Sequence, residues 1–286
     1  MFKLLRKTAQ TGLVTIDYPK TPARLSKNFR GAPRFDFSAW RDPRLAADAC
    51  PTDAISIHET ETKRLVTIDY GRCVYCGQCA EADPDGAVEI TTQFELAAVD
   101  RRNLVLTAEY GLDSTGKQAD LKKLHHGYWP VEDTPEWQQR AVRDRIHQVL
   151  GRSLAIREVD AGSCNGCEVE INALNNPVYD LERFGMHFVA SPRHADMLLV
   201  TGPVTRNMEL ALVKTYRATP DPKVVVAVGA CGISGGIFGR NYATLGGVDE
   251  VIPVGVFVPG CPPRPQALLH GILLAVGRIG QKSLPQ

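Results

Sequence analysis

Residues 224–232 read Val-Val-Val-Ala-Val-Gly-Ala-Cys-Gly, an unbroken apolar run that ends in glycine and cysteine. Segments of helical length separate this run from four other strand-like runs, which are Leu154–Val159, His187–Ala190, Met197–Thr201 and Val251–Val258. Continuous Val, Ile and Leu runs that alternate with helices are typical of a parallel sheet covered on both faces. We therefore predict an α/β fold for residues 151–286, with a parallel sheet and helices on both of its faces.

Cysteine-bearing loops follow three of these predicted strands. The loops are Cys164-Asn-Gly-Cys167, Gly229-Ala-Cys231-Gly232 and Pro259-Gly-Cys261-Pro-Pro263. Working groups in such sheets lie just beyond the carboxyl ends of the strands, so we expect these four cysteines to form one site. The flanking glycines let backbone N–H groups approach inorganic sulfide, which suits a 4Fe–4S cluster. Zinc stays an alternative for four thiolates, whereas a catalytic Cys–His pair is disfavoured because no histidine lies in these motifs.

The N-terminal half carries the run Cys73-Val-Tyr-Cys76-Gly-Gln-Cys79, whose spacing lets one loop hold three corners of a cubane. In two-cluster ferredoxins a fourth cysteine follows, just before a proline, and binds the other cluster. Asp83 takes that position here, whereas Cys50-Pro51 upstream looks like the end of a sister motif. Counting back from Cys50, the other three ligand positions of that sister motif hold Trp40, Pro43 and Ala46.

These substitutions leave one complete ligand set. The remaining cysteines are the four that build a single cluster, namely Cys50, Cys73, Cys76 and Cys79. The lost positions all belong to the other cluster. We predict one 4Fe–4S cluster in a domain shaped for two, with Asp83 as an ordinary turn acid and Trp40 filling the vacated space.

Whole-chain composition narrows the function classes. The chain has 286 residues, which suggests about two domains, and a net charge of +1, which gives no support for nucleic-acid binding. It has eight cysteines and no recognisable secretory signal, so metal binding is favoured over disulfides and we expect the chain inside the cell. No apolar run reaches the roughly 18 residues of a membrane-spanning helix.

We predict four segments along the chain. Residues 1–34 form a basic arm, whose Phe2, Leu4 and Leu5 suit a membrane surface or an acidic partner; a solvated arm that orders only on assembly is an equal alternative. Residues 35–95 form a small α+β, ferredoxin-like domain, with strands at Ala54–His58 and Val88–Thr92. Residues 96–150 form a connector with a helix at Pro135–Leu150, and residues 151–286 form the α/β domain.

Four motifs resemble the small subunit of group 4 NiFe-hydrogenases, the formate hydrogenlyase and energy-converting types. They are Ser163-Cys-Asn-Gly-Cys-Glu-Val-Glu170, Ser191-Pro-Arg-His-Ala-Asp196, Val200-Thr-Gly-Pro203 and Pro259-Gly-Cys-Pro-Pro263. This family is homologous to the B subunit of respiratory complex I, which typically has adjacent cysteines at the first ligand position, so the Cys164-Asn-Gly-Cys167 spacing favours the hydrogenase branch. Residues 1–110 resemble the ferredoxin-like subunit of the same complexes.

The resemblance implies a flavodoxin-like sheet and an electron-transfer subunit that is not catalytic by itself. It implies two 4Fe–4S clusters, one facing a separate hydrogenase-like large subunit and one forming an outer relay to an external electron carrier such as ferredoxin or a dehydrogenase subunit. Membrane-embedded antiporter-like subunits would hold the chain at the cytoplasmic face of the inner membrane. A proton path through Glu168 or Glu170 is weighed against ordinary solvated or salt-bridged acids.

Two other functions stay open. One is an equivalent subunit of a complex I-like ferredoxin or quinone oxidoreductase whose large subunit lacks nickel. The other is a zinc-bound scaffold within such an assembly.

Overall fold

The computed structural model describes residues 2–113, 116–127 and 153–285, and its C-terminal half is built on a five-stranded parallel sheet. The strands are β7 (Leu154–Asp160), β8 (Met186–Phe188), β9 (Met197–Thr201), β10 (Val224–Val228) and β11 (Val256–Val258). Their spatial order is β8-β7-β9-β10-β11, which is the order of flavodoxin-like sheets. The predicted parallel sheet is therefore confirmed, although its last strand is shorter than Val251–Val258.

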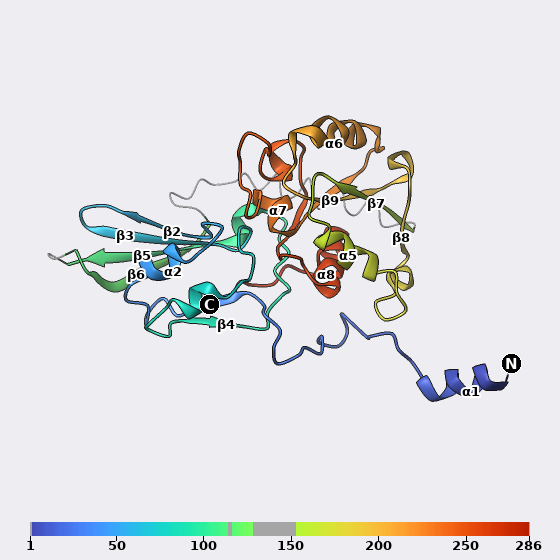
Figure 1. The fold of residues 1–286 in the computed structure, drawn as a ribbon, viewed down its shortest axis with the longest axis horizontal. Coiled ribbons are helices and arrows are strands. Elements are labelled where there is room, and N and C mark those ends of the chain that lie inside the picture. Colours follow the sequence, from blue (N-terminus) through green and yellow to red (C-terminus); the bar gives the residue numbers. More distant parts are fainter. Residues whose placement is uncertain (1, 114–115, 128–152, 286) are drawn as a thin grey trace.

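Helices cover both faces of this sheet, as predicted. Along β10, Val224, Val226 and Val228 belong to the hydrophobic cluster that includes α5 (Gly166–Ala173) and α8 (Pro265–Ala275). The intervening Val225 and Ala227 belong to a second cluster, shared with α6 (Arg206–Ala218) and α7 (Gly229–Ser234). Figure 1 shows α6 above the strands and α5 and α8 below them. Every residue of β10 is buried because both faces are covered.

The N-terminal half contains two antiparallel sheets. The larger has the order β2-β3-β5-β6, and the smaller pairs β1 with β4. Their bounds are β1 (Pro33–Phe35), β2 (Ile55–Glu59), β3 (Lys63–Asp69), β4 (Val88–Ile90), β5 (Val105–Leu112) and β6 (Gln118–His126), with short helices α2 (Arg44–Asp48) and α3 (Gln78–Glu81). Four single 3-10 turns complete the described structure, at Arg101–Leu104, Leu181–Phe184, Pro192–His194 and Val248–Glu250.

Residues 105–112 and 118–126 differ from the predicted connector. In place of a connector they form β5 and β6, which pair with β3 and complete the larger N-terminal sheet. Seven of the eight residues of β5 are buried, because β5 lies between β3 and β6. Its sequence, Val-Leu-Thr-Ala-Glu-Tyr-Gly-Leu, contains Thr, Glu and Gly, so it lacks the continuous apolar run by which the other strands were found. The helix predicted at Pro135–Leu150 lies outside the described residues.

The two halves share one hydrophobic core. A single cluster runs from Phe35 and Leu106 of the N-terminal sheets to Val225 and Phe257 of the parallel sheet. Ala98 donates to and accepts from Phe257 at 3.0 and 2.8 Å, and so pairs with the outer edge of β11. This pairing, with the shared core, fixes the halves against each other.

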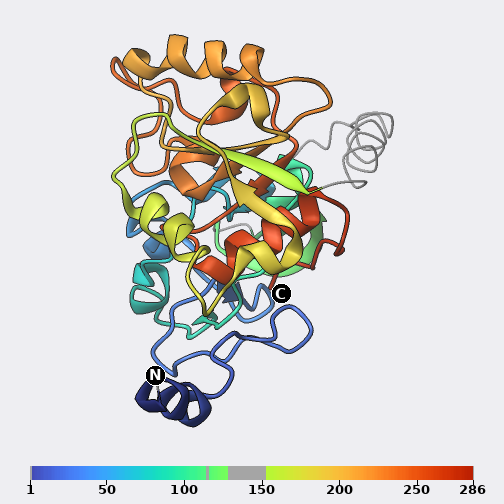
Figure 2. The ribbon, with the colours of Figure 1, turned by 90° about the vertical axis from the view of Figure 1, so that its right-hand side faces the viewer.

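The first residues lie apart from the three sheets. Helix α1 (Phe2–Thr11) has no buried residue, and both views show it at the edge of the molecule (Figure 1 and Figure 2). Residues 15–18 of the arm lie against the C-terminal half, where the Ile16 amide donates to the Val178 carbonyl at 2.9 Å. No helix in the described parts of the chain is long and apolar enough to cross a bilayer.

Candidate metal centres

The structure brings together the four cysteines of the N-terminal set. Cys50 lies between α2 and β2, Cys73 and Cys76 lie in the loop after β3, and Cys79 is in α3. All four line one cavity, and apolar side chains such as Ile55 complete its wall. None of the four takes part in a disulfide. Thiols in an apolar cavity form a donor set that suits iron in a cluster.

Backbone amides point at two of these sulfurs. The Ala54 amide donates to Cys50 Sγ at 3.3 Å, and the Tyr75 amide donates to Cys73 Sγ at 3.4 Å. Tyr75 has a left-handed backbone (φ 56°). Burial, and after it the neighbouring thiols of Cys76 and Cys50, raise the pKa of the Cys79 thiol to about 11. The N–H donors would stabilise thiolates that burial alone disfavours.

The positions of the lost cluster are filled by packed side chains. Trp40 is only 1% exposed, and its ring lies 5.1 Å from the Phe35 ring, centroid to centroid. Ala46 is fully buried in the same hydrophobic cluster. The Asp83 carboxylate accepts hydrogen bonds from the amides of Asp85, at 3.3 Å, and Val88, at 2.9 Å. Asp83 is therefore the turn acid that the sequence predicted, and Trp40 is part of the core.

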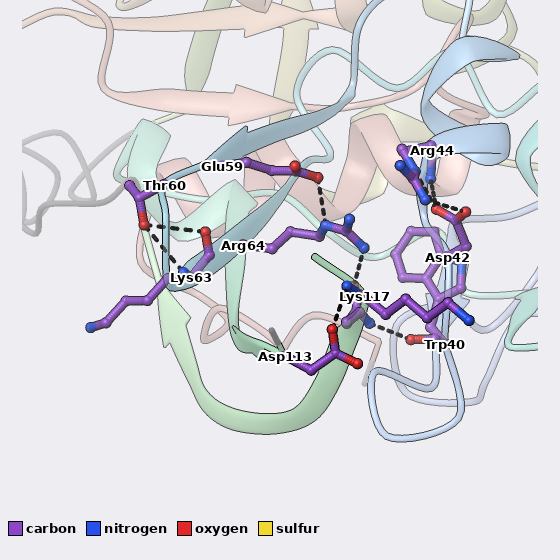
Figure 3. A network of polar contacts seen from close by, with 10 residues as sticks. Trp40, Asp42, Arg44, Glu59, Thr60, Lys63, Arg64, Asp113 and Lys117 are labelled. Atoms are coloured by element: carbon purple, nitrogen blue, oxygen red, sulfur yellow. Dashed lines mark hydrogen bonds and ion pairs between the residues drawn. The ribbon is translucent and has the colours of Figure 1, made fainter. Parts of the chain in front are cut away.

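A polar network supports the Trp40 region from outside the cavity (Figure 3). The guanidinium of Arg64, on β3, is almost fully buried and donates to Glu59 Oε1 at 2.7 Å and to Gln118 Oε1 at 3.2 Å. Gln118 in turn donates to the Trp40 carbonyl at 2.6 Å. The network ties β3 and β6 to the segment that carries the tryptophan, and no pattern in the sequence had indicated it.

The second cysteine set gathers at the carboxyl edge of the parallel sheet. Cys164 and Cys167 follow β7, Cys231 follows β10 within α7, and Cys261 follows β11. The Ala230 amide donates to the Gly260 carbonyl at 2.8 Å, which holds the last two of these loops together. The sheet places three loops that are distant in sequence at one edge, as expected for a parallel α/β fold.

Glycine is required where these loops meet. Gly229 has φ +78°, and a Cβ there would lie 2.8 Å from Cys167 Sγ. A Cβ on Gly236 would likewise lie 2.8 Å from Cys231 Sγ. The backbone therefore passes directly against two of the four sulfurs, the close approach that flanking glycines allow.

Electrostatic coupling also shows that this set converges. Burial raises the pKa of the Cys167 thiol above its ordinary value, and Glu168 and the thiols of Cys231, Cys261 and Cys164 raise it further. Cys167 is buried, whereas Cys164 and Cys261 are exposed. The site therefore has an inner side against the sheet and an outer side open at the molecular surface.

Two residues of the Cys73–Cys76 loop line two cavities. Val74 and Tyr75 line the N-terminal cavity and also a second cavity, of which Cys261 is part. The Tyr75 hydroxyl is buried and has no hydrogen-bond partner among the described residues. One short segment of chain thus lines the cavity of the first cysteine set and a cavity that includes Cys261 of the second.

Glu168, one of the two acids for which a proton path was weighed against an ordinary solvated or salt-bridged role, lies beside an acid that the sequence analysis missed. Glu168 accepts a short hydrogen bond from the Thr201 hydroxyl, and it lines a polar cavity together with Glu158 of β7. Burial raises the pKa of Glu158, and Glu168 and then Asp160 raise it further. Burial also raises the pKa of Glu170, against the opposing effect of Arg264. The sequence did contain a signal for Glu158, because an acid within a predicted strand of a sheet covered on both faces is unusual.

Among the described residues, no group of three or more His, Cys, Asp or Glu side chains has the geometry to hold a single metal ion. The role of the eight cysteines as cluster ligands stays a prediction. Both sets consist of four thiols. Backbone amides donate hydrogen bonds to two sulfurs of the N-terminal set, and glycine backbone lies against two sulfurs of the second set. Both fit a cluster of iron and sulfide.

Comparison with known proteins identifies relatives of the C-terminal half. The family model described as NADH ubiquinone oxidoreductase, 20 Kd subunit, matches residues 164–275. The probable membrane-bound hydrogenase subunit mbhJ of Pyrococcus furiosus is 51% identical over 148 residues, which are 50% of this chain and 88% of that protein. Formate hydrogenlyase subunit 7 of Escherichia coli is 46% identical over 54% of this chain and 60% of its own length.

A complex I relative is similar to nearly the same degree. The B subunit of the NADH-quinone oxidoreductase of Geotalea daltonii is 49% identical over 41% of this chain and 68% of that protein. The family model begins at residue 164, so the resemblance of the N-terminal half to a ferredoxin-like subunit stays a prediction. Both the hydrogenase and the complex I branches that the sequence motifs indicated are thus among its relatives. The chain belongs to the family of the NADH:ubiquinone oxidoreductase 20 kDa subunit.

Proposed function

We propose that the chain is the electron-transfer subunit of a membrane-associated hydrogenase complex, and that each cysteine set holds one 4Fe–4S cluster. One observation carries the proposal: eight thiols fall into two sets of four, and residues 74–75 line both the cavity of the first set and a cavity that includes Cys261 of the second. Clusters of this type accept and release single electrons without making or breaking substrate bonds. The chain itself is then not catalytic, and its residues bind, insulate and space the two redox centres.

The second set is the side that meets the catalytic subunit in this proposal. Cys164 and Cys261 are exposed at the molecular surface, and the nearby apolar side chains of Val169, Ile237 and Phe238 are 58%, 63% and 52% exposed. Exposed apolar residues beside a redox site suit a large protein interface. A hydrogenase-like large subunit would cover them and exclude water from the sulfurs.

The N-terminal set is the outer relay in this proposal. It faces an external electron carrier, such as ferredoxin or a dehydrogenase subunit, and passes electrons through the 74–75 segment. The names of the relatives from Pyrococcus furiosus and Escherichia coli support a complex of this kind, one of them described as membrane-bound. Membrane-embedded antiporter-like subunits would then be further partners at the cytoplasmic face of the membrane.

A second candidate function has its own support. The family model is named for NADH ubiquinone oxidoreductase, and the Geotalea daltonii relative belongs to an NADH-quinone oxidoreductase. In that case the large subunit lacks nickel and the electrons go to or from a quinone or ferredoxin. Nickel content of the purified complex separates the two functions, since only the hydrogenase contains it.

Iron and sulfide analysis of the chain, with electron paramagnetic resonance after dithionite reduction, tests the proposal. We expect about eight irons per chain and the signals of two clusters. The Cys73→Ala variant loses one signal and the Cys167→Ala variant loses the other, and each keeps about four irons. Zinc in place of reducible iron, or the loss of both signals in each variant, would contradict two independent sites.

A further inference from the structure

We propose that helix α1 (Phe2–Thr11) binds the surface of a membrane that contains anionic phospholipid. This inference does not rest on the proposed redox function. It starts from the exposure of the helix: every residue of α1 is exposed, including Phe2 at 84%, Leu4 at 74% and Leu5 at 57%. Large apolar side chains on a helix with no buried residue suit another apolar environment.

The side chains of α1 are sorted by face. Phe2, Leu5 and Ala9 follow the i, i+3, i+7 spacing and share one side of the helix. Lys3 and Lys7, four residues apart, share another side. Such a helix lies in the membrane interface with its apolar side among the acyl chains and its cations at the headgroups.

Charge identifies the kind of membrane. Three cations, Lys3, Arg6 and Lys7, lie within α1, and the first acid of the chain is Asp17, beyond its end. The whole chain has a net charge of only +1, so this is a local concentration of positive charge. Anionic headgroups attract such segments by about 1 kcal/mol per cation. Ten residues of helix span about 15 Å, which suits lying along the surface and not crossing it.

The arm fixes where α1 lies on the molecule. Only residues 12–14 separate α1 from Thr15, whose hydroxyl donates to the Pro177 carbonyl at 2.8 Å. The Arg183 guanidinium donates to the carbonyls of Ile16, at 2.5 Å, and Tyr18, at 2.7 Å. Binding of α1 to a membrane would therefore hold the C-terminal half close to the lipid surface, with the 177–183 segment nearest to it.

Sedimentation of the full chain with vesicles tests the proposal. The vesicles contain phosphatidylcholine alone or phosphatidylcholine with phosphatidylglycerol, at low and high salt. We expect binding to the anionic vesicles that weakens with salt, and much weaker binding to the neutral ones. A chain with both Lys3→Ser and Lys7→Ser should bind about 25-fold more weakly, at about fivefold per charge. Leu5→Glu should abolish binding.

Helix α6 supplies matched controls. Leu210 is 62% exposed there, close to the value for Leu5, and Lys214 is an exposed cation on the same helix. Leu210→Glu and Lys214→Ser should bind vesicles like the unaltered chain. Because no residue of α1 is buried, its variants should keep the same denaturation midpoint and iron content, so a folding defect or a failure of the redox proposal is recognised separately.

Three results would overturn the proposal. The first is equal binding to neutral and anionic vesicles, and the second is unchanged binding by the α1 variants. The third is no vesicle binding at all, together with loss of a co-purifying protein subunit in the Leu5→Glu chain. That last result would assign α1 to an acidic protein groove.

Discussion

Replacing Gly229 with alanine places a methyl group against the Cys167 thiol. The added Cβ would lie 2.8 Å from Cys167 Sγ, whereas ordinary contacts between heavy atoms are about 3.5–4 Å, so the sulfur or the loop must move by nearly 1 Å. In addition, the left-handed backbone at φ +78° costs an alanine about 1–2 kcal/mol. The variant thus combines a general loss of stability with a local displacement of one predicted ligand.

Gly185 separates these two effects. It has a similar backbone, at φ +73°, and no described atom lies within 4 Å of the position of its missing Cβ. Gly185→Ala should therefore lose about 1–2 kcal/mol of unfolding free energy from backbone strain alone. Any further loss in Gly229→Ala comes from the contact with Cys167.

Iron analysis and electron paramagnetic resonance provide the assay, with urea denaturation as the measure of stability. Gly185→Ala should keep about eight irons, whereas Gly229→Ala should keep about four and lose only the signal that Cys167→Ala loses. Full iron and an unchanged spectrum in Gly229→Ala would refute our account of how the second set is built. Equal loss of both signals would show that the strain acts on the whole fold and not on one site.

Three further predictions concern the core. His270 is 1% exposed, and burial lowers its pKa to about 4, so it is uncharged in the folded chain and charged in the unfolded chain below pH 6.5. Its contribution to stability is present above pH 6.5 and is lost as the pH falls toward 4. The free energy of unfolding, measured by urea denaturation, should therefore fall by about 2 kcal/mol between pH 7 and pH 5. In His270→Leu this fall should be absent. Trp40→Ala should lower the free energy of unfolding by about 4 kcal/mol, measured by urea denaturation, and should keep the iron content and the signal that Cys73→Ala loses. An unchanged denaturation midpoint would mean that Trp40 does not fill the space of the missing cluster. Arg64→Ala should lower the free energy of unfolding by about 2 kcal/mol because it breaks a buried hydrogen-bond network. Arg44 is exposed, so Arg44→Ala should have little effect. Equal losses in the two variants would contradict the role given to that network.

Tertiary pairing decided what the sequence could not reveal in the N-terminal half. The cysteine spacing at residues 73–79 was readable because a loop that wraps a cubane needs fixed intervals between its ligands. Strand β5 was not readable, because its Thr107 and Glu109 are buried only through the neighbouring strands that cover them. Part of the predicted connector therefore forms strands β5 and β6 of a sheet, and Gln118 of β6 belongs to the Arg64 network.

The amino-acid sequence by itself determined the parallel sheet, the family, and the grouping of eight cysteines into two sets. The sheet and the two cysteine sets follow from local intervals along the chain, namely continuous apolar runs, glycines beside cysteine and the C-x2-C spacing, whereas the family follows from motifs that resemble those of its members. Only the tertiary structure placed Val74 and Tyr75 in the lining of the first set's cavity and of the cavity that includes Cys261, brought Glu158 beside Glu168, and left α1 with no buried residue. These depend on which distant side chains share a core, and that is settled by burial across the whole fold.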